Sequence, residues 1–195
     1  VPAKIDAAEA DVPAAQGLPK PSLVFPNHGD HAYAKVALDA ESLAFTRANI
    51  HRIDDPMLRQ MLWSALWNIT RDQQLTSLDF LAIVREKIAT EESIELVDAV
   101  LGYAQTALGR FVPDDWKEEQ GHLMFLGAWD ALQGGVTGDR QIIWTRALVG
   151  FAMSAGDIAL LGRLADGSET VPGLTLDQDM RWAIATKLNA YGMPD

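Results

Sequence analysis

Apolar positions between residues 55 and 72 recur at steps of three and four residues, the spacing of one helix face. Asp55 precedes this run and can cap the first turn with its carboxylate, and Pro56 stands where a missing N–H costs nothing. Trp63 and Trp67, four residues apart, add a second apolar face. A helix that is apolar over most of its circumference needs neighbours on several sides, so the pattern predicts a helix inside a stack. The first face consists of Met57, Met61, Leu62, Ala65, Leu66 and Ile69.

The same periodicity continues from Asp39 onward and predicts helices before and after this one. Thr76, with Asp79 three residues later, resembles a capping box. The eight predicted helices cover about residues 39–52, 55–72, 76–88, 92–110, 114–134, 139–153, 156–167 and 177–191. Outside the Trp-rich helix, the residues expected to point inward are Leu43, Ile50, Ile53, Leu78, Leu81, Val84, Ile88, Ile94, Val97, Val100, Leu101, Ala104, Leu108, Trp116, Leu123, Leu126, Trp129, Met180, Ile184 and Leu188.

Short loops between these helices make successive helices antiparallel, which predicts stacked helical hairpins. The sequence has no repeat of fixed period, so it does not predict a regular solenoid. We therefore expect a mainly α protein, an irregular α-superhelix of the HEAT or armadillo kind, with a closed helical bundle as the alternative.

The first 38 residues have a different character. Residues 1–21 hold four prolines and no apolar period, which is typical of a linker or of edge-strand material. From Ser22 to Asp39, short β-prone runs flank turn residues at 27–30, which predicts a small β-hairpin, two short strands or an extended segment. The predicted division is therefore 1–38 for linker and strands and 39–195 for the helical domain.

Composition narrows the function classes. The net charge of −11 argues against sequence-independent nucleic-acid binding, because no basic stripe is present to neutralise phosphates. No apolar run approaches the roughly 20 residues that span a bilayer, and the first residues lack the layout of a signal peptide. The chain has no Cys, which excludes disulfides and thiolate chemistry and fits a reducing compartment. We expect a cytoplasmic protein without a membrane or nucleic-acid partner.

Three groups of residues carry metal-binding or acid–base chemistry in principle. His28, Asp30 and His31 are metal-ligand types, but they lie on a predicted turn where Asp and Gly serve the backbone. Asp114, Asp115 and Glu118 resemble an Asp-rich magnesium motif of all-α isoprenoid enzymes. Acidic residues in a first helical turn are also what the helix dipole favours. An independent all-α enzyme that used these three acids would depend on magnesium.

The third group is Glu118 with His122, which lie one helical turn apart and either share a ligand or form a solvated salt bridge. An H-E-x-x-H motif, a serine nucleophile elbow and a phosphate-binding glycine loop are all absent from the sequence. We therefore assign no catalytic residue and no metal ligand, and the substrate-binding residues stay unknown. From the residues alone, the chain is an acidic, helical, non-catalytic module.

Three blocks in order resemble bacterial aminopeptidase N, a family of gluzincin zinc metallopeptidases. Residues 23–39 are similar to the junction before the C-terminal helical domain of that family, including the Pro-Asn turn and a Tyr-x-Lys-Val strand. Residues 59–75 carry a similar Trp-x3-Trp spacing, and residues 142–188 a similar Val-Pro-Gly-Leu loop. This chain has His28-Gly29 where the family more usually has an acidic cluster.

The resemblance implies a division of labour. The parent enzyme would remove N-terminal residues from peptides with zinc-activated water, and its zinc ligands have no counterpart in this chain. The chain would be the truncated, non-catalytic cap that closes the substrate chamber, preceded by the end of a β-domain and by the catalytic domain. The alternative is a free-standing helical-repeat adaptor that binds a partner protein in its groove. An upstream H-E-x-x-H-x18-E in the genomic reading frame would decide between them.

Overall fold

The computed structural model of the chain describes residues 10–192, which contain eight α-helices and no β-strand. The prediction of a mainly α fold with eight helices is confirmed. The helices are α1 Ala40–Asn49, α2 Pro56–Arg71, α3 Ser77–Lys87, α4 Ile94–Arg110, α5 Asp114–Gln133, α6 Gly138–Phe151, α7 Ala155–Asp166 and α8 Gln178–Ala190. Short 3₁₀ helices occur at Pro13–Ala15, Ile50–Arg52 and Ile88–Thr90.

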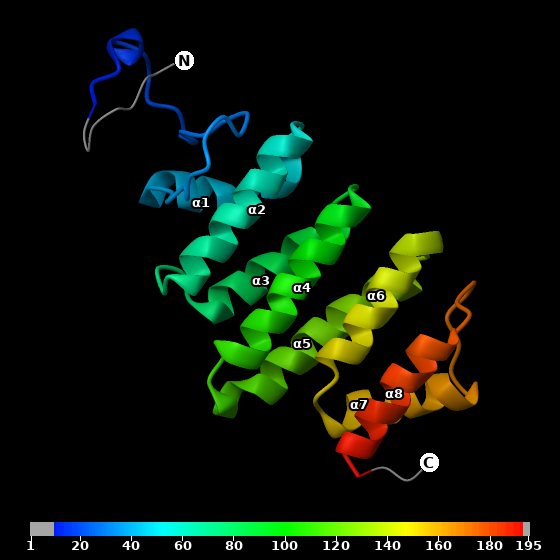
Figure 1. Cartoon of the computed structure of the whole chain (residues 1–195). Coiled ribbons are helices and arrows are strands. Elements are labelled where there is room, and N and C mark those ends of the chain that lie inside the picture. Colours follow the sequence, from blue (N-terminus) through cyan, green and yellow to red (C-terminus); the bar gives the residue numbers. More distant parts are fainter. Residues whose placement is uncertain (1–9, 193–195) are drawn as a thin grey trace.

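The helices form two layers of a stack (Figure 1). In one layer α2, α4, α6 and α8 follow one another side by side. In the second layer α3 packs beside α5, and α7 follows at the end of the stack. Each helix of the second layer also packs on its successor in the first, so the chain zigzags between the layers as expected for stacked hairpins.

Polar residues before the helices fix where several of them begin. The Asp55 carboxylate accepts hydrogen bonds from the amides of Met57 and Leu58, and Pro56 opens α2, as the sequence indicated. The Thr76 hydroxyl likewise accepts from the amide of Asp79 at the start of α3. These caps satisfy amides that have no partner within their helix.

One hydrophobic core runs through the stack between the two layers. In α2, Leu62 and Leu66 are fully buried and Trp63 nearly so, while Trp67 is only partly buried. The Trp67 ring stacks on Tyr103 of α4 with centroids 5.0 Å apart and also lies close to Phe80 of α3. The Trp-rich helix therefore does contact neighbours on several sides, which was the basis for placing it inside the stack.

The inward face predicted for α5 is partly wrong. Trp116 and Leu126 are 48% and 41% exposed, although the sequence placed both inward. The face that is buried instead comprises Gly121, Met124, Phe125, Ala128 and Leu132. Apolar residues occupy consecutive positions from 123 to 126, so periodicity alone does not select a face, and packing against α3 and α6 decides it.

Exposure also corrects two residues in first helical turns. Met57 of α2 and Ile94 of α4 were expected to point inward, and both are exposed. Each lies in the first turn of its helix, where fewer neighbouring helices pack than at the centre.

The predicted β-hairpin at residues 22–39 does not form, and this stretch is extended with one turn. The Asn27 side chain closes the turn, because its amide donates to the Ala32 carbonyl at 2.8 Å and its oxygen accepts from the Ala32 amide at 3.0 Å. A hairpin needs ladder bonds between two strands, and here a side chain takes the place of the partner backbone. Residues 1–9 and 193–195 lie outside the described residues.

Candidate functional site

An open groove of about 590 Å³ lies between α5 and α7. One stripe of α5 and one stripe of α7 form its walls, and Glu169, which follows α7, also lines it. Leu126, Trp129 and Leu160 give it an apolar surface that contrasts with the acidic charge of the chain. The complete lining is His122, Phe125, Leu126, Trp129, Gln133, Gly156, Asp157, Leu160, Arg163 and Glu169.

The polar centre of this groove is a contact between His122 of α5 and Asp157 of α7. His122 Nδ1 lies 2.7 Å from Asp157 Oδ1, and the Asp157 side chain is only 1% exposed. The second oxygen, Oδ2, accepts hydrogen bonds from the backbone amides of Met153 and Ser154 at 3.1 and 3.0 Å. Burial raises the pKa of Asp157, but the bonds from Ser154, His122 and Met153 outweigh it and lower that pKa.

Ser154, His122 and Asp157 are the residue types of a hydrolase triad, but their geometry excludes that mechanism. Ser154 Oγ lies 3.4 Å from His122 Nδ1, the same ring nitrogen that contacts Asp157. A triad needs the serine and the carboxylate on opposite ring nitrogens, so that the histidine can take the serine proton. Ser154 instead caps α7, since its hydroxyl accepts from the Asp157 amide. The contacts at His122 therefore fix the start of α7 against α5 and do not form a serine hydrolase triad.

The sequence paired His122 with Glu118, and this partner is wrong. In the structure His122 contacts Asp157 from a different helix, and Glu118 is exposed. Asp157 was missed as a candidate, although its position three residues after Ser154 is the spacing of a capping box. That spacing signals a carboxylate turned back on the helix start, but not the histidine that meets it from a distant segment.

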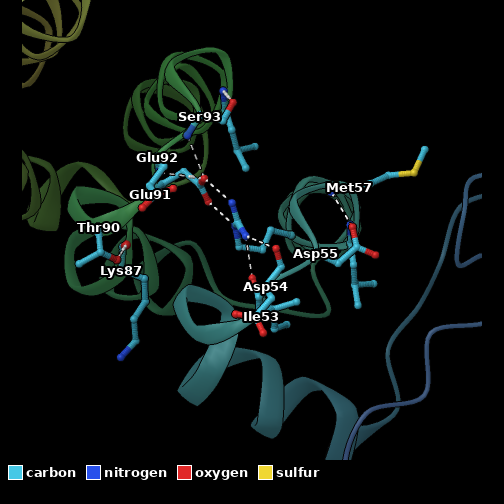
Figure 2. Close-up of polar contacts among 12 residues, drawn as sticks. Ile53, Asp54, Asp55, Met57, Lys87, Thr90, Glu91, Glu92 and Ser93 are labelled. Atoms are coloured by element: carbon cyan, nitrogen blue, oxygen red, sulfur yellow. Dashed lines mark hydrogen bonds and ion pairs between the residues drawn. The ribbon is translucent and has the colours of Figure 1, made fainter.

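A second polar centre joins α2 to the loop before α4 (Figure 2). Arg59 Nε donates to one oxygen of the Glu91 carboxylate at 2.9 Å, and its Nη2 donates to the other at 3.0 Å. The side chains are 14% and 4% exposed, so this is a largely buried ion pair. Arg59 also donates to the carbonyl of Ile53 at 2.7 Å, and Glu91 accepts from the Ser93 amide at 3.1 Å.

The Glu91 carboxylate is held ionised by its surroundings. Burial raises the pKa of Glu91, and the bonds from Arg59 and from the Ser93 and Glu92 amides reverse this and lower it. Arg140 of α6 donates to the carbonyls of Glu91 and Glu92 at 2.6 and 2.7 Å. Both oxygens of the Glu91 carboxylate thus accept hydrogen bonds within the cluster. Through Arg59 and Arg140, the cluster connects α2 and α6 to the loop before α4.

The residue groups that the sequence analysis considered for metal binding do not gather into a site within residues 10–192, where no group of three or more His, Asp and Glu could hold an ion. His28 Nε2 lies 3.3 Å from Asp55 Oδ2, while Asp30 accepts from the Asn27 amide. In α5, the Asp114 carboxylate pairs with Lys117 at 2.7 Å, and Asp115 and Glu118 are exposed. Among the described residues, these candidates therefore do not come together as three ligands of one ion.

Comparison with known proteins gives the family. Residues 23–195 match the family described as the ERAP1-like C-terminal domain. This chain belongs to that family. It is also 30% identical over 194 residues to aminopeptidase N of Streptomyces lividans. The aligned region covers 96% of this chain and 22% of the relative, so the chain spans about a fifth of the relative's length.

The resemblance to aminopeptidase N inferred from sequence is thus confirmed. The match to the ERAP1-like C-terminal domain begins at Leu23, so it takes in the extended segment, the Arg59–Glu91 pair and the α5–α7 groove. Both polar centres therefore belong to the matched domain. None of the helices described in this ERAP1-like C-terminal domain has the length and apolar character needed to cross a membrane.

Proposed function

We propose that this chain is the non-catalytic helical cap of a zinc aminopeptidase, which removes N-terminal residues from peptides. The observation that carries the proposal is the alignment, which covers nearly all of this chain and about a fifth of an aminopeptidase N. The absence of a metal-ligand cluster from residues 10–192 supports the same division, since a catalytic zinc needs three protein ligands. The zinc and its ligands would lie elsewhere in the polypeptide, outside this domain.

The two-layer stack suits a covering role. Its helices are joined by one continuous core and cross-linked by the Arg59–Glu91 and His122–Asp157 contacts, so the surface keeps its shape without a bound partner. Such a domain would close a chamber that admits peptides and excludes folded proteins. Covering a chamber requires a surface of fixed shape and does not require a reactive group from this chain.

Residues 31–38 would contact the preceding β-domain. Tyr33 is fully exposed on this extended stretch. The backbone amides of residues 33–38 donate no hydrogen bond to a backbone carbonyl of the described residues. An extended stretch with free amides is suited to add a strand to the edge of a sheet. We propose that this stretch, within residues 1–38, completes the β-domain, and that residues 39–195 form the helical cap.

The genomic reading frame provides the first test. We expect an H-E-x-x-H-x18-E sequence upstream of this segment in the same frame. A complete reading frame without that motif would overturn the proposal and favour the free-standing adaptor, for which the α5–α7 groove would be the partner site.

Activity provides the second test. We expect no hydrolysis of aminoacyl chromogenic substrates by the purified chain, with or without zinc, and no stoichiometric zinc after dialysis. His28 and His31 lie on an exposed turn and can take up metal weakly without catalysis, so zinc content and turnover must be read together. Stoichiometric zinc together with chelator-sensitive turnover would contradict the assignment of this chain as a non-catalytic cap.

A further inference from the structure

Residues 20–38 lie against α1 and α2 and are called the strap here. His28 contacts Asp55, the N-cap of α2, and Lys35 contacts Asp72, the C-cap of α2. The helix between these caps is about 24 Å long at 1.5 Å per residue. The side chains of His28 and Lys35 therefore attach the strap to both ends of α2.

The first half of the strap is attached to α1 in a similar way. Lys20 pairs with Glu41 in the first turn of that helix. The Val24 amide donates to the Ser42 hydroxyl at 2.9 Å, and the same hydroxyl donates to Asp39, the N-cap. The strap is thus attached at the caps of both helices, and in Figure 1 it approaches the stack only at this end.

Most of these attachments are exposed to solvent. Lys35 Nζ lies 2.9 and 2.7 Å from the two carboxylate oxygens of Asp72, with side chains 58% and 37% exposed. Exposed ion pairs contribute little and are screened by salt. The apolar attachment is also small, since Val36 is the one buried apolar side chain of the strap and Leu23, Phe25 and Leu38 are only partly buried. The helices beneath, by contrast, contain fully buried leucines.

We propose that the strap is a conformational device that opens as a local unit while the helical stack stays folded. Local opening takes place where few apolar contacts and many exposed polar contacts hold a segment, and the strap meets both conditions. The turn at 27–30 stays closed through Asn27 and has Gly29 and Asp30 at positive φ, so it forms a natural pivot. If the proposed function holds, opening would change the angle between the cap and the β-domain. The opening itself does not depend on that function.

The test compares Lys35→Gln with Lys117→Gln in the full 195-residue chain. Both substitutions remove one cation from an exposed ion pair, but the Lys117–Asp114 pair lies in α5, away from the strap. Chymotrypsin cleavage after Tyr33 reports opening, because the protease needs a locally unfolded segment around the exposed ring. At about 0.01 M salt, where screening extends over about 30 Å, Lys35→Gln should be cleaved about two- to five-fold faster than the wild type.

Three further results complete the expectation. Lys117→Gln should be cleaved at the wild-type rate. At about 1 M salt the wild type should reach the rate of Lys35→Gln, since screening then removes the pair. The urea midpoint of the helical core should be the same in all three proteins. Equal cleavage of Lys35→Gln and wild type at low salt would overturn the proposal, as would a rate that rises only in proportion to a lowered urea midpoint.

Discussion

Replacing Arg59 with methionine tests whether the buried ion pair with Glu91 organises the first half of the stack. Methionine keeps an apolar stem of similar length and removes only the guanidinium. The Glu91 carboxylate, 4% exposed, would then keep its backbone donors at Glu92 and Ser93 but lose its counterion. The Ile53 carbonyl would lose its bond from Arg59 as well.

The expected cost follows from what is left behind. Removing one partner of a buried pair typically destabilises a protein by about 3–5 kcal/mol, because the remaining charge stays desolvated. We expect Arg59→Met to lower the free energy of unfolding within that range. Adding Glu91→Gln should recover part of the loss, since the double variant no longer buries an unpaired charge. The coupling energy of the cycle should therefore exceed about 1.5 kcal/mol.

Urea unfolding, followed by tryptophan fluorescence, measures these free energies. Arg163→Met is the matched control, because Arg163 faces Glu169 at 3.7 Å with half of its side chain exposed. Its cost should stay below about 1 kcal/mol. A cost below about 1 kcal/mol for Arg59→Met, with additive effects in the cycle, would refute the reasoning.

The stability difference between the wild type and Arg59→Met should also depend on pH. The folded pKa of Glu91 is lowered, so its contribution is present above the unfolded pKa of about 4.3 and is lost as pH falls through the folded pKa. In Arg59→Met no guanidinium opposes the effect of burial on Glu91. The difference in stability between wild type and variant should therefore shrink as the pH falls below about 4.

Three other substitutions test the packing and the groove. Trp67→Ala should lower the free energy of unfolding by about 2–3 kcal/mol, less than the loss of a fully buried tryptophan, because the ring is half-buried against Tyr103. A cost under about 1 kcal/mol would show that the two rings are not packed. Gly121→Ala should cost about 1–3 kcal/mol because its Cβ would meet a backbone oxygen at 3.0 Å, whereas Gly102→Ala, with open space around it, should be neutral or stabilising. Asp157→Asn should lose less stability on acidification than the wild type. The lowered pKa of Asp157 contributes stability at pH values above its unfolded pKa of about 3.9, and this contribution is lost as the pH falls through the folded pKa. The same loss of stability with acid in both proteins would contradict this.

Local rules were enough to predict where most helices begin. Asp55 and Thr76 have cap chemistry in the sequence, and each caps its helix in the structure. These predictions succeeded because a cap depends on residues within one helical turn. The same reasoning identified the buried face of α8 and, apart from Met57, that of α2.

What the sequence did not predict depends on distant segments. The inward face of α5 is chosen by α3 and α6, because its own residues are apolar on adjoining sides. The strands expected before Asp39 lack a partner within residues 10–192 and remain extended. His122 and Asp157 are 35 positions apart, and no spacing rule joins them. Contacts between distant helices of the stack can be predicted only once the arrangement of the helices is known.

The two buried carboxylates of this acidic domain serve its structure. Asp157 is occupied by two backbone amides and His122, and Glu91 is occupied by two amides and Arg59. Each has a lowered pKa, so neither holds a proton to donate near neutral pH, and neither has a free oxygen directed at solvent. A general acid or base needs a pKa near the working pH and access to substrate. Both buried carboxylates therefore connect helices: Glu91 is bonded to Arg59 of α2, and Asp157 of α7 to His122 of α5.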